Sequence, residues 1–171
     1  MWSGIWEFFL CNRTECSSIG ISLSENEVQI AQRIAIKNGL HNRCTFIFQN
    51  FDQLIEDKFD LILASGSIKH SIDLPKTIDN LVQSLLPGGK LIIVEDFFIK
   101  KNSSYWTKTL LREWCLKSPY TIEEYLKKLE FYPNLEMKLH DLTLFLIHKK
   151  TAKLYFQFVM SFFRSTLSGV F

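Results

Sequence analysis

Four short apolar runs recur along the first part of this chain, and segments of helical length separate them. The runs occupy residues 18–22, 44–48, 59–64 and 90–95. Each run is almost continuously apolar, as is typical of strands in a parallel sheet that is covered on both faces. Parallel neighbours need a long crossover rather than a tight hairpin, and the spacers are long enough to supply one. The pattern therefore predicts an α/β fold with an open, mostly parallel sheet.

The first spacer carries the end signals of a helix. Ser24 followed by Glu27 is a capping-box pattern, in which two side chains satisfy the exposed amides at a helix start. It predicts a helix over residues 25–38, and Gly39 supplies a left-handed stop. We expect this helix to bury Val28, Ala31 and Ala35 along one side, with Ile30 and Ile34 beside them.

A second helix is predicted just before the last run. Asp73 lies upstream of Pro75, which is a favoured residue in the first turn of a helix. Apolar residues then recur at three- and four-residue steps as far as Leu86, and the Pro-Gly-Gly at 87–89 ends the pattern. We therefore expect a helix that reaches from Pro75 to Leu86.

The signals beyond residue 100 are weaker. Residues 105–116 have a helical pattern, and a capping box of Thr121 and Glu124 predicts a helix that continues to Phe131. Apolar and polar residues alternate over 135–140, which predicts a half-exposed strand. A last helix over 144–163 and an untethered end complete a single domain of residues 1–171.

Composition restricts the class of protein. The net charge of +2 is too small to indicate a nucleic-acid surface. The four cysteines lack metal or disulfide spacing, so we expect no metal site and a reducing, cytoplasmic location. The N-terminal residues do not resemble a signal peptide. The longest apolar stretch, 154–163, is shorter than the roughly 20 residues of a spanning helix, so no transmembrane segment is predicted.

Polar and small residues follow the predicted strands. Ligands of open α/β sheets bind outside the carboxyl ends of the strands. The residues to weigh at these ends are therefore Ser22, Leu23, Gln49, Asn50, Phe51, Ala64, Ser65, Gly66, Ser67, His70, Glu95 and Asp96. We regard the last two as ordinary loop carboxylates rather than catalytic groups.

Four stretches, in order and at matching spacing, resemble one known family. They are Gly-Ile-Ser-Leu-Ser at 20–24, Phe-Asp-Leu-Ile-Leu at 59–63, Ile-Lys-His-Ser at 68–71, and the segment 86–96 that begins Leu-Pro-Gly-Gly. The chain resembles the class I S-adenosylmethionine-dependent methyltransferases, and within them the tocopherol, sterol and cyclopropane-fatty-acid branch. The resemblance covers residues 5–98 well and implies a Rossmann-like sheet.

The resemblance implies roles for individual residues. Residues 1–98 would hold the cofactor, S-adenosylmethionine, and residues 99–171 would form the substrate side. Ser22 would lie at the ribose, Asn50 would accept from the adenine amino group, and Phe51 would flank the adenine ring. His70 would be a general base or orient the acceptor; the alternative is a histidine that caps the turn before the next helix. The other implied cofactor contacts are Gly4, Leu23, Ala64 and Gly66.

The chain departs from the family pattern at its start. The family has a first strand and a Gly-x-Gly-x-Gly loop there, and only Gly4 of that loop remains. Gly66 also stands where the family often has a glutamate. The resemblance therefore implies a chain truncated at the N-terminus, and past Arg164 at the C-terminus as well. The absent strand would leave two inner sheet edges unpaired.

Three functions follow from these observations. The first is methyl transfer to a small, apolar acceptor, with weakened cofactor binding. The second is a non-catalytic scaffold that pairs with a partner chain or a second copy through its open edges and an aromatic helix near residues 156–163. The third is a truncated product without a function of its own.

Overall fold

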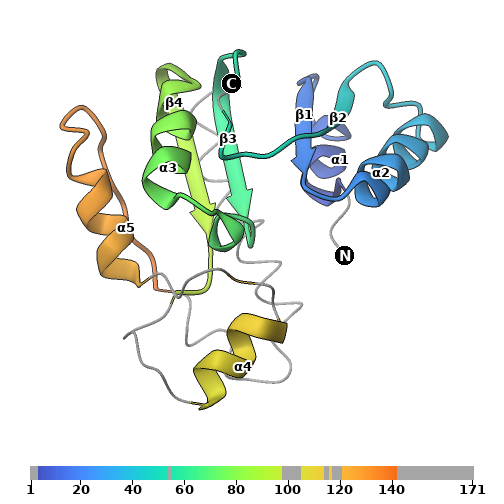
Figure 1. The fold of residues 1–171 in the computed structure, drawn as a ribbon. Helices are drawn as coiled ribbons and strands as arrows, with labels where there is room; N and C mark the ends of the chain where they lie inside the picture. Colours follow the sequence, from blue (N-terminus) through green and yellow to red (C-terminus); the bar gives the residue numbers. More distant parts are fainter. Residues whose placement is uncertain (1–3, 54, 98–104, 114–115, 117–120, 142–171) are drawn as a thin grey trace. The chain divides into compact units, whose positions relative to one another are not determined.

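The computed structural model describes residues 4–53, 55–97, 105–113, 116 and 121–141. The chain divides into two units, Met1–Phe131 and Tyr132–Phe171, and every helix and strand named here lies in the first. In chain order (Figure 1) the elements are α1 (Ile5–Cys11), β1 (Ser18–Ser22), α2 (Glu25–Lys37), β2 (Cys44–Phe48), β3 (Phe59–Ser65), the 3-10 turn η1 (Ile68–His70), α3 (Leu74–Gln83), β4 (Leu85–Val94), α4 (Tyr105–Glu113) and α5 (Ile122–Leu129).

The four predicted strands form, and they pair in parallel. β1 pairs with β2 from Ser18 opposite Cys44 to Ser22 opposite Phe48. β3 pairs with β4, with Ala64 opposite Ile93. In the part of the chain that the structure describes, the strands make two separate pairs (Figure 1), so β1 and β3 each have a strand neighbour on one side only. The predicted parallel α/β arrangement is confirmed.

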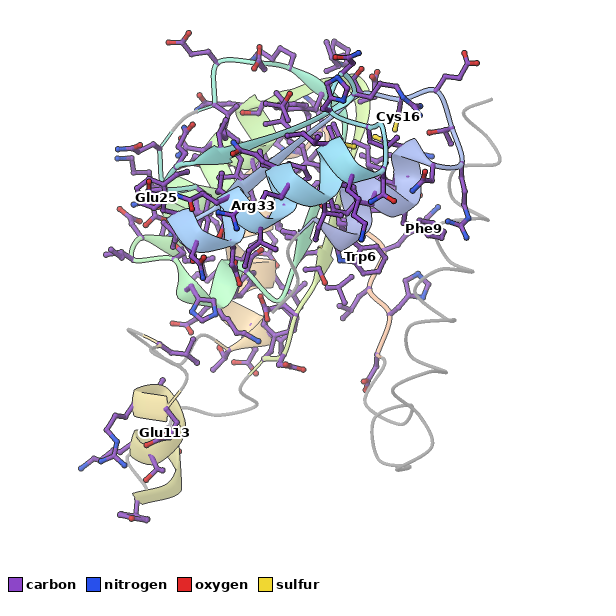
Figure 2. All side chains as sticks on the ribbon, turned by 90° about the vertical axis from the view of Figure 1, so that its right-hand side faces the viewer. Trp6, Phe9, Cys16, Glu25, Arg33 and Glu113 are labelled. Atoms are coloured by element: carbon purple, nitrogen blue, oxygen red, sulfur yellow. The ribbon has the colours of Figure 1, made fainter. Side chains whose placement is uncertain are left out.

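Helix α2 forms as its end signals predict. The Ser24 hydroxyl accepts the backbone N–H of Glu27, and Gly39 has a φ of +69° just beyond the helix. Glu25 and Arg33 lie on the exposed face of α2 (Figure 2), while Val28, Ala31 and Ala35 are buried. The buried core around this helix consists of Cys11, Val28, Ala31, Ala35, Leu40, Cys44 and Phe46.

Gly4 begins helix α1 in the left-handed region, with a φ of +76°. A Cβ atom at this position would lie 2.7 Å from the ring of Phe8 and 2.9 Å from that of Phe46. The two rings pack with their centroids 5.4 Å apart. Close packing, as well as backbone conformation, therefore requires glycine here.

The predicted end of the second helix is wrong. Asp73 does cap α3, by accepting the N–H of Lys76, but the helix ends at Gln83 instead of Leu86. The buried Ser84 is the reason, because its carbonyl accepts from Phe59 N (2.9 Å) and its hydroxyl donates to the carbonyl of Ile55 (3.1 Å). Because of these bonds the chain leaves the helix at Ser84 and β4 begins at Leu85. The Pro-Gly-Gly at 87–89 therefore lies within the strand instead of ending a helix.

The later part of the described chain contains one further correction. α4 forms within the predicted range, and α5 has the complete capping box of Thr121 and Glu124. Residues 135–140, however, form no strand. Met137 is 50% and Leu139 62% exposed, so the alternation produces no buried face. The helix predicted over 144–163 and the end at 165–171 lie outside the described residues.

Candidate functional site

Ser22 ends β1 and is fixed by two hydrogen bonds. Its hydroxyl donates to the carboxylate of Glu27 (2.9 Å) and accepts from the N–H of Ser24 (3.1 Å). The capping box predicted for Ser24 and Glu27 is therefore only half formed, because the Glu27 carboxylate takes the Ser22 hydroxyl as its donor. Leu23 follows with 47% of its surface exposed. A hydroxyl and a carboxylate thus lie together at this strand end.

The loop after β2 starts beside Ser22, since Gln49 N donates to the Ser22 carbonyl (3.2 Å). The side-chain oxygen of Asn50 accepts the N–H of Asp52 (2.9 Å), which makes a tight local turn. An amide oxygen has two lone pairs, so one remains for a ligand. Phe51, between these two residues, is half-buried.

Asp52 is the centre of a buried polar network. Its carboxylate accepts from the hydroxyls of Ser71 (2.8 Å) and Thr77 and from the N–H of Ile72 (3.1 Å). Its carbonyl accepts from the side chain of Asn80 (2.8 Å). Burial raises the pKa of Asp52, but these donors outweigh burial and hold the pKa below its ordinary value. The carboxylate therefore stays charged and fixes the loop after β2 to η1 and α3.

The end of β3 is open at Gly66. Ala64 is buried, and Gly66 has a φ of +62° while its N–H donates to the carbonyl of Val94 (2.8 Å). The nearest heavy atom to a Cβ added at Gly66 would be Lys69 Nζ, at 4.0 Å. At Gly66, where the resemblance implied a glutamate, no side chain fills the space, and the Lys69 ammonium lies at its border.

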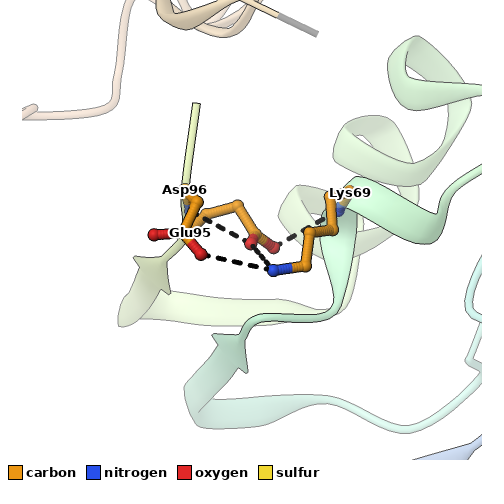
Figure 3. Close-up of polar contacts among 3 residues, drawn as sticks. All are labelled: Lys69, Glu95 and Asp96. Atoms are coloured by element: carbon orange, nitrogen blue, oxygen red, sulfur yellow. Dashed lines mark hydrogen bonds and ion pairs between the residues drawn. The ribbon is translucent and has the colours of Figure 1, made fainter. Parts of the chain in front are cut away.

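Lys69 and Glu95 form an ion pair at the ends of β3 and β4 (Figure 3). Lys69 Nζ lies 3.1 Å from the Glu95 carboxylate, which also accepts the backbone N–H of Lys69 at 3.3 Å. The exposed Asp96 carboxylate lies 3.5 Å from the same ammonium. Only 1% of the Glu95 side chain is exposed, so it is a buried partner of η1 rather than an ordinary loop carboxylate.

His70 is the last residue of η1 and is half-buried. Burial lowers the pKa of its imidazole, the neighbouring Lys69 lowers it further, and Glu95 opposes them. Its backbone N–H donates to the carbonyl of Ser67 (3.0 Å), in the turn before the helix start that Asp73 caps. Both roles given for His70, acting on the acceptor and capping this turn, stay predictions. Among the described residues no hydrogen bond holds the imidazole, so its nitrogens remain available.

The structure brings the candidate residues together in two groups. Ser22 and Asn50 lie at the ends of the β1–β2 pair, and Gly66 and His70 lie at the end of β3. The two groups are joined through the Asp52 carboxylate. Asp52 comes directly after Phe51, and its carboxylate accepts from Ser71 and Ile72, which follow His70. Gly4 lies at the start of α1 against Phe8 and Phe46, and no contact among the described residues joins it to either group.

Sequence reasoning missed three residues of this region: Glu27, Asp52 and Lys69. The pattern Asn50-x-Asp52 could have indicated a turn that fixes the loop, since Asn accepts the N–H two residues on. No local pattern predicts the other two contacts. They join Glu27 to the preceding strand and Lys69 to β4, and they follow only from the packed fold.

The described residues show neither a metal cluster nor a membrane-spanning helix. No group of three or more His, Cys, Asp or Glu side chains is placed to hold a metal ion there. The thiols of Cys11, Cys16 and Cys44 are free. No described helix has both the length and the apolar content to cross a membrane.

Solved structures define the class of fold. Geranyl diphosphate C-methyltransferase from Streptomyces coelicolor A3(2) matches with a TM-score of 0.69 at 16% identity, over 75% of this chain and 48% of that chain. The 4+2 cyclase SpnF matches with a TM-score of 0.63 at 21% identity, over 75% of this chain and 47% of that one. These likenesses confirm the predicted Rossmann-like fold of the class I methyltransferase type.

Sequence comparison identifies the family. The model of a family described as a methyltransferase domain matches residues 7–143, and the chain belongs to that family. The chain is 34% identical over 88 residues to the chloroplastic tocopherol O-methyltransferase of Arabidopsis thaliana. The match covers 50% of this chain and 25% of that enzyme, so the chain spans only part of the length of this relative.

Proposed function

We propose that this chain transfers a methyl group from S-adenosylmethionine to a small, apolar acceptor. The observation that carries the proposal is the junction of the two strand-end groups through Asp52 and Ser71, within a chain of the methyltransferase family. Residues to about 98 would hold the cofactor and residues 99–171 would form the acceptor side. The three free thiols favour a reducing compartment, and we propose the cytoplasm.

The strand-end residues fit an adenosyl cofactor. The Glu27 carboxylate beside Ser22 can accept hydrogen bonds from both hydroxyls of a ribose. Asn50 keeps a lone pair for the adenine amino group, and Phe51 supplies an apolar face for the ring. Leu23, Ala64 and the free space at Gly66 would border the rest of the cofactor.

Methyl transfer depends more on how the acceptor is positioned than on charged groups of the protein. When bound, S-adenosylmethionine supplies an electrophilic methyl group on a positively charged sulfur. Because the protein only has to align an acceptor atom with that methyl, most of the rate comes from orientation. His70 would accept the acceptor's proton, and an imidazole with a lowered pKa is uncharged and ready to do so at neutral pH.

Isothermal titration with S-adenosylmethionine tests the proposal. We expect Glu27→Gln to weaken binding about tenfold, because the loss of one charged acceptor costs about 1.4 kcal/mol. Glu25→Gln is the matched control: Glu25 lies in the same first turn of α2 but on its exposed face (Figure 2), and its loss leaves affinity unchanged. A folded sample that binds no cofactor at millimolar concentration contradicts the proposal.

One observation favours a second function, a methyltransferase-like scaffold. In the described part of the chain β1 and β3 each pair on one side only, which leaves backbone groups that a partner strand or a second copy would satisfy. Light scattering separates the two functions. A monomer with normal cofactor affinity contradicts the scaffold, whereas a stable complex that binds no cofactor supports it.

A further inference from the structure

The Glu95 carboxylate holds η1 at two points. It accepts both the backbone N–H of Lys69 (3.3 Å) and the side-chain ammonium of Lys69 (3.1 Å), as Figure 3 shows. Glu95 follows the last residue of β4 directly, so the attachment point is the end of a paired strand. Such a double contact fixes both the position of the turn and the direction of the lysine side chain.

Burial makes this ion pair costly to form. The Glu95 side chain is 1% exposed and that of Lys69 is 17% exposed. Removing two charges from water costs about as much as, or more than, their attraction returns, so stability alone does not account for the pair. Gly66 leaves the space beside the ammonium free, since an added Cβ would still be 4.0 Å away. The charge is therefore held at the border of the open position.

We propose that Lys69 and Glu95 are positioning residues for His70: Glu95 fixes the turn that carries the imidazole, and Lys69 places a positive charge next to it. The proposal rests on the proposed function, in which His70 takes the proton of the acceptor. A fixed turn keeps the imidazole at the carboxyl end of β3. A neighbouring positive charge disfavours a second positive charge on the ring.

The charges around His70 act in opposite directions. Burial lowers the pKa of His70 most, Lys69 lowers it further, and Glu95 raises it. Three other carboxylates lie near the turn. The Asp52 carboxylate accepts from the Ser71 hydroxyl (2.8 Å) and the Ile72 N–H (3.1 Å), directly after His70. Asp96 is exposed and pairs with Lys69 at 3.5 Å, and Asp73 accepts the N–H of Lys76. Changes at Lys69 and at Glu95 should therefore move the pKa of His70 in opposite senses.

NMR titration of the His70 ring in the full chain tests this. Lys69→Met keeps the length of the side chain and removes its charge, so we expect the pKa of His70 to shift upward. Glu95→Gln keeps an oxygen for the Lys69 N–H and removes the negative charge, so we expect a downward shift. The spectrum of His70→Gln assigns the His70 signal among the four histidines of the chain.

Two variants serve as controls. Lys69→Arg keeps the positive charge and should restore the wild-type titration, which loss of packing alone would not do. Asp96→Asn removes the exposed carboxylate and should leave the titration unchanged. If Lys69→Met does not fold, the shift of the His70 pKa in Glu95→Gln alone tests the proposal. Shifts of the same sign in the two variants, or no shift in Glu95→Gln, overturn the proposal.

The titration needs no cofactor, so its failure is distinct from failure of the proposed function. A chain that binds no S-adenosylmethionine contradicts methyl transfer, while the His70 shifts still confirm or overturn the charge arrangement. For an active chain, the acid limb of kcat/KM should move with the measured pKa in each variant. An acid limb that stays fixed while the pKa moves overturns the positioning role.

Discussion

Asp52 is the residue on which the candidate site most depends. It is 8% exposed, and its carboxylate accepts from Ser71 and Ile72, directly after η1, and from Thr77 on α3. Hydrogen bonds to charged groups stabilise a fold by about 1.5–3 kcal/mol each, and a buried donor left without its partner costs a similar amount. The candidate adenine loop is held in place by these bonds.

We expect Asp52→Asn to lower the free energy of unfolding by about 2–3 kcal/mol, because one amide oxygen cannot replace a carboxylate among three donors. Asp57→Asn, at an exposed position of the same loop, is the control and should change stability by less than about 0.5 kcal/mol. Urea denaturation measures both. Equal losses in the two variants would contradict the assigned network.

The same variant should change how stability depends on pH. The pKa of Asp52 in the folded protein lies below its ordinary value of 3.8, so its contribution is complete above that value and is lost as pH falls through the folded pKa. Asp52→Asn should remove this part of the acid sensitivity. A variant that loses stability in acid as steeply as the wild type shows that the carboxylate is not charged in the fold.

Sequence predicted which residues stand at the strand ends, but not what they contact. Ser22, Asn50 and His70 follow strands that the apolar runs define, and their positions are as predicted. Their roles with a ligand stay predictions. Asp52 binds residues up to 28 positions away, and such partners depend on packing that no local pattern records.

At the scale of elements, the boundary between α3 and β4 shows where local signals fail. The three- and four-residue steps continue past Gln83, so the sequence alone favours a longer helix. The bonds of Ser84 to Phe59 and Ile55 outweigh that preference, because they satisfy buried polar groups. The alternation over 135–140 failed for another reason, since its apolar residues Met137 and Leu139 stay exposed and form no buried face.

Two adjacent glycines in the first half of β4, Gly88 and Gly89, allow backbone strain to be compared with close packing. A Cβ at Gly89 would lie 2.9 Å from the carbonyl oxygens of Leu86 and Phe59, which are backbone atoms that cannot turn aside. Gly88 has a φ of +79° but nothing within 4 Å of its added Cβ. We expect Gly89→Ala to cost about 2–3 kcal/mol through overpacking and Gly88→Ala only about 1 kcal/mol of backbone strain. Thermal unfolding measures both changes in stability. If Gly88→Ala lost more stability than Gly89→Ala, the close contacts at Gly89 would be relieved easily and the assignment would be wrong.

At the scale of the whole molecule, the edge of β1 that faces away from β2 is the feature that matters most. Ser18 N donates to the carbonyl of Arg43 and the Ser22 carbonyl accepts from Gln49 N, the residues on either side of β2. Alternation along the strand therefore directs the amides of Ile19 and Ile21 to the other side. In the described part of the chain no strand covers that side. Apolar strand edges of this kind readily pair with another chain.

Hydrogen exchange should separate the two sides of β1. We expect the amides of Ile19 and Ile21 to exchange faster than that of Gly20, which points toward β2. All three belong to one short strand, so local fraying affects them equally. If the three amides were equally protected at micromolar protein concentration and lost this protection on dilution, a second copy would cover the free edge of β1. That result would favour the scaffold function.

The bond between Asp52 and Ser71 has a thermodynamic consequence. One side of it carries the loop proposed for the adenine, and the other carries the turn proposed for proton removal. Under the proposed function, a nucleoside that binds this loop would also change the pKa of the imidazole. Because linkage is reciprocal, adding a proton at the turn would then change the affinity for the nucleoside by the same factor.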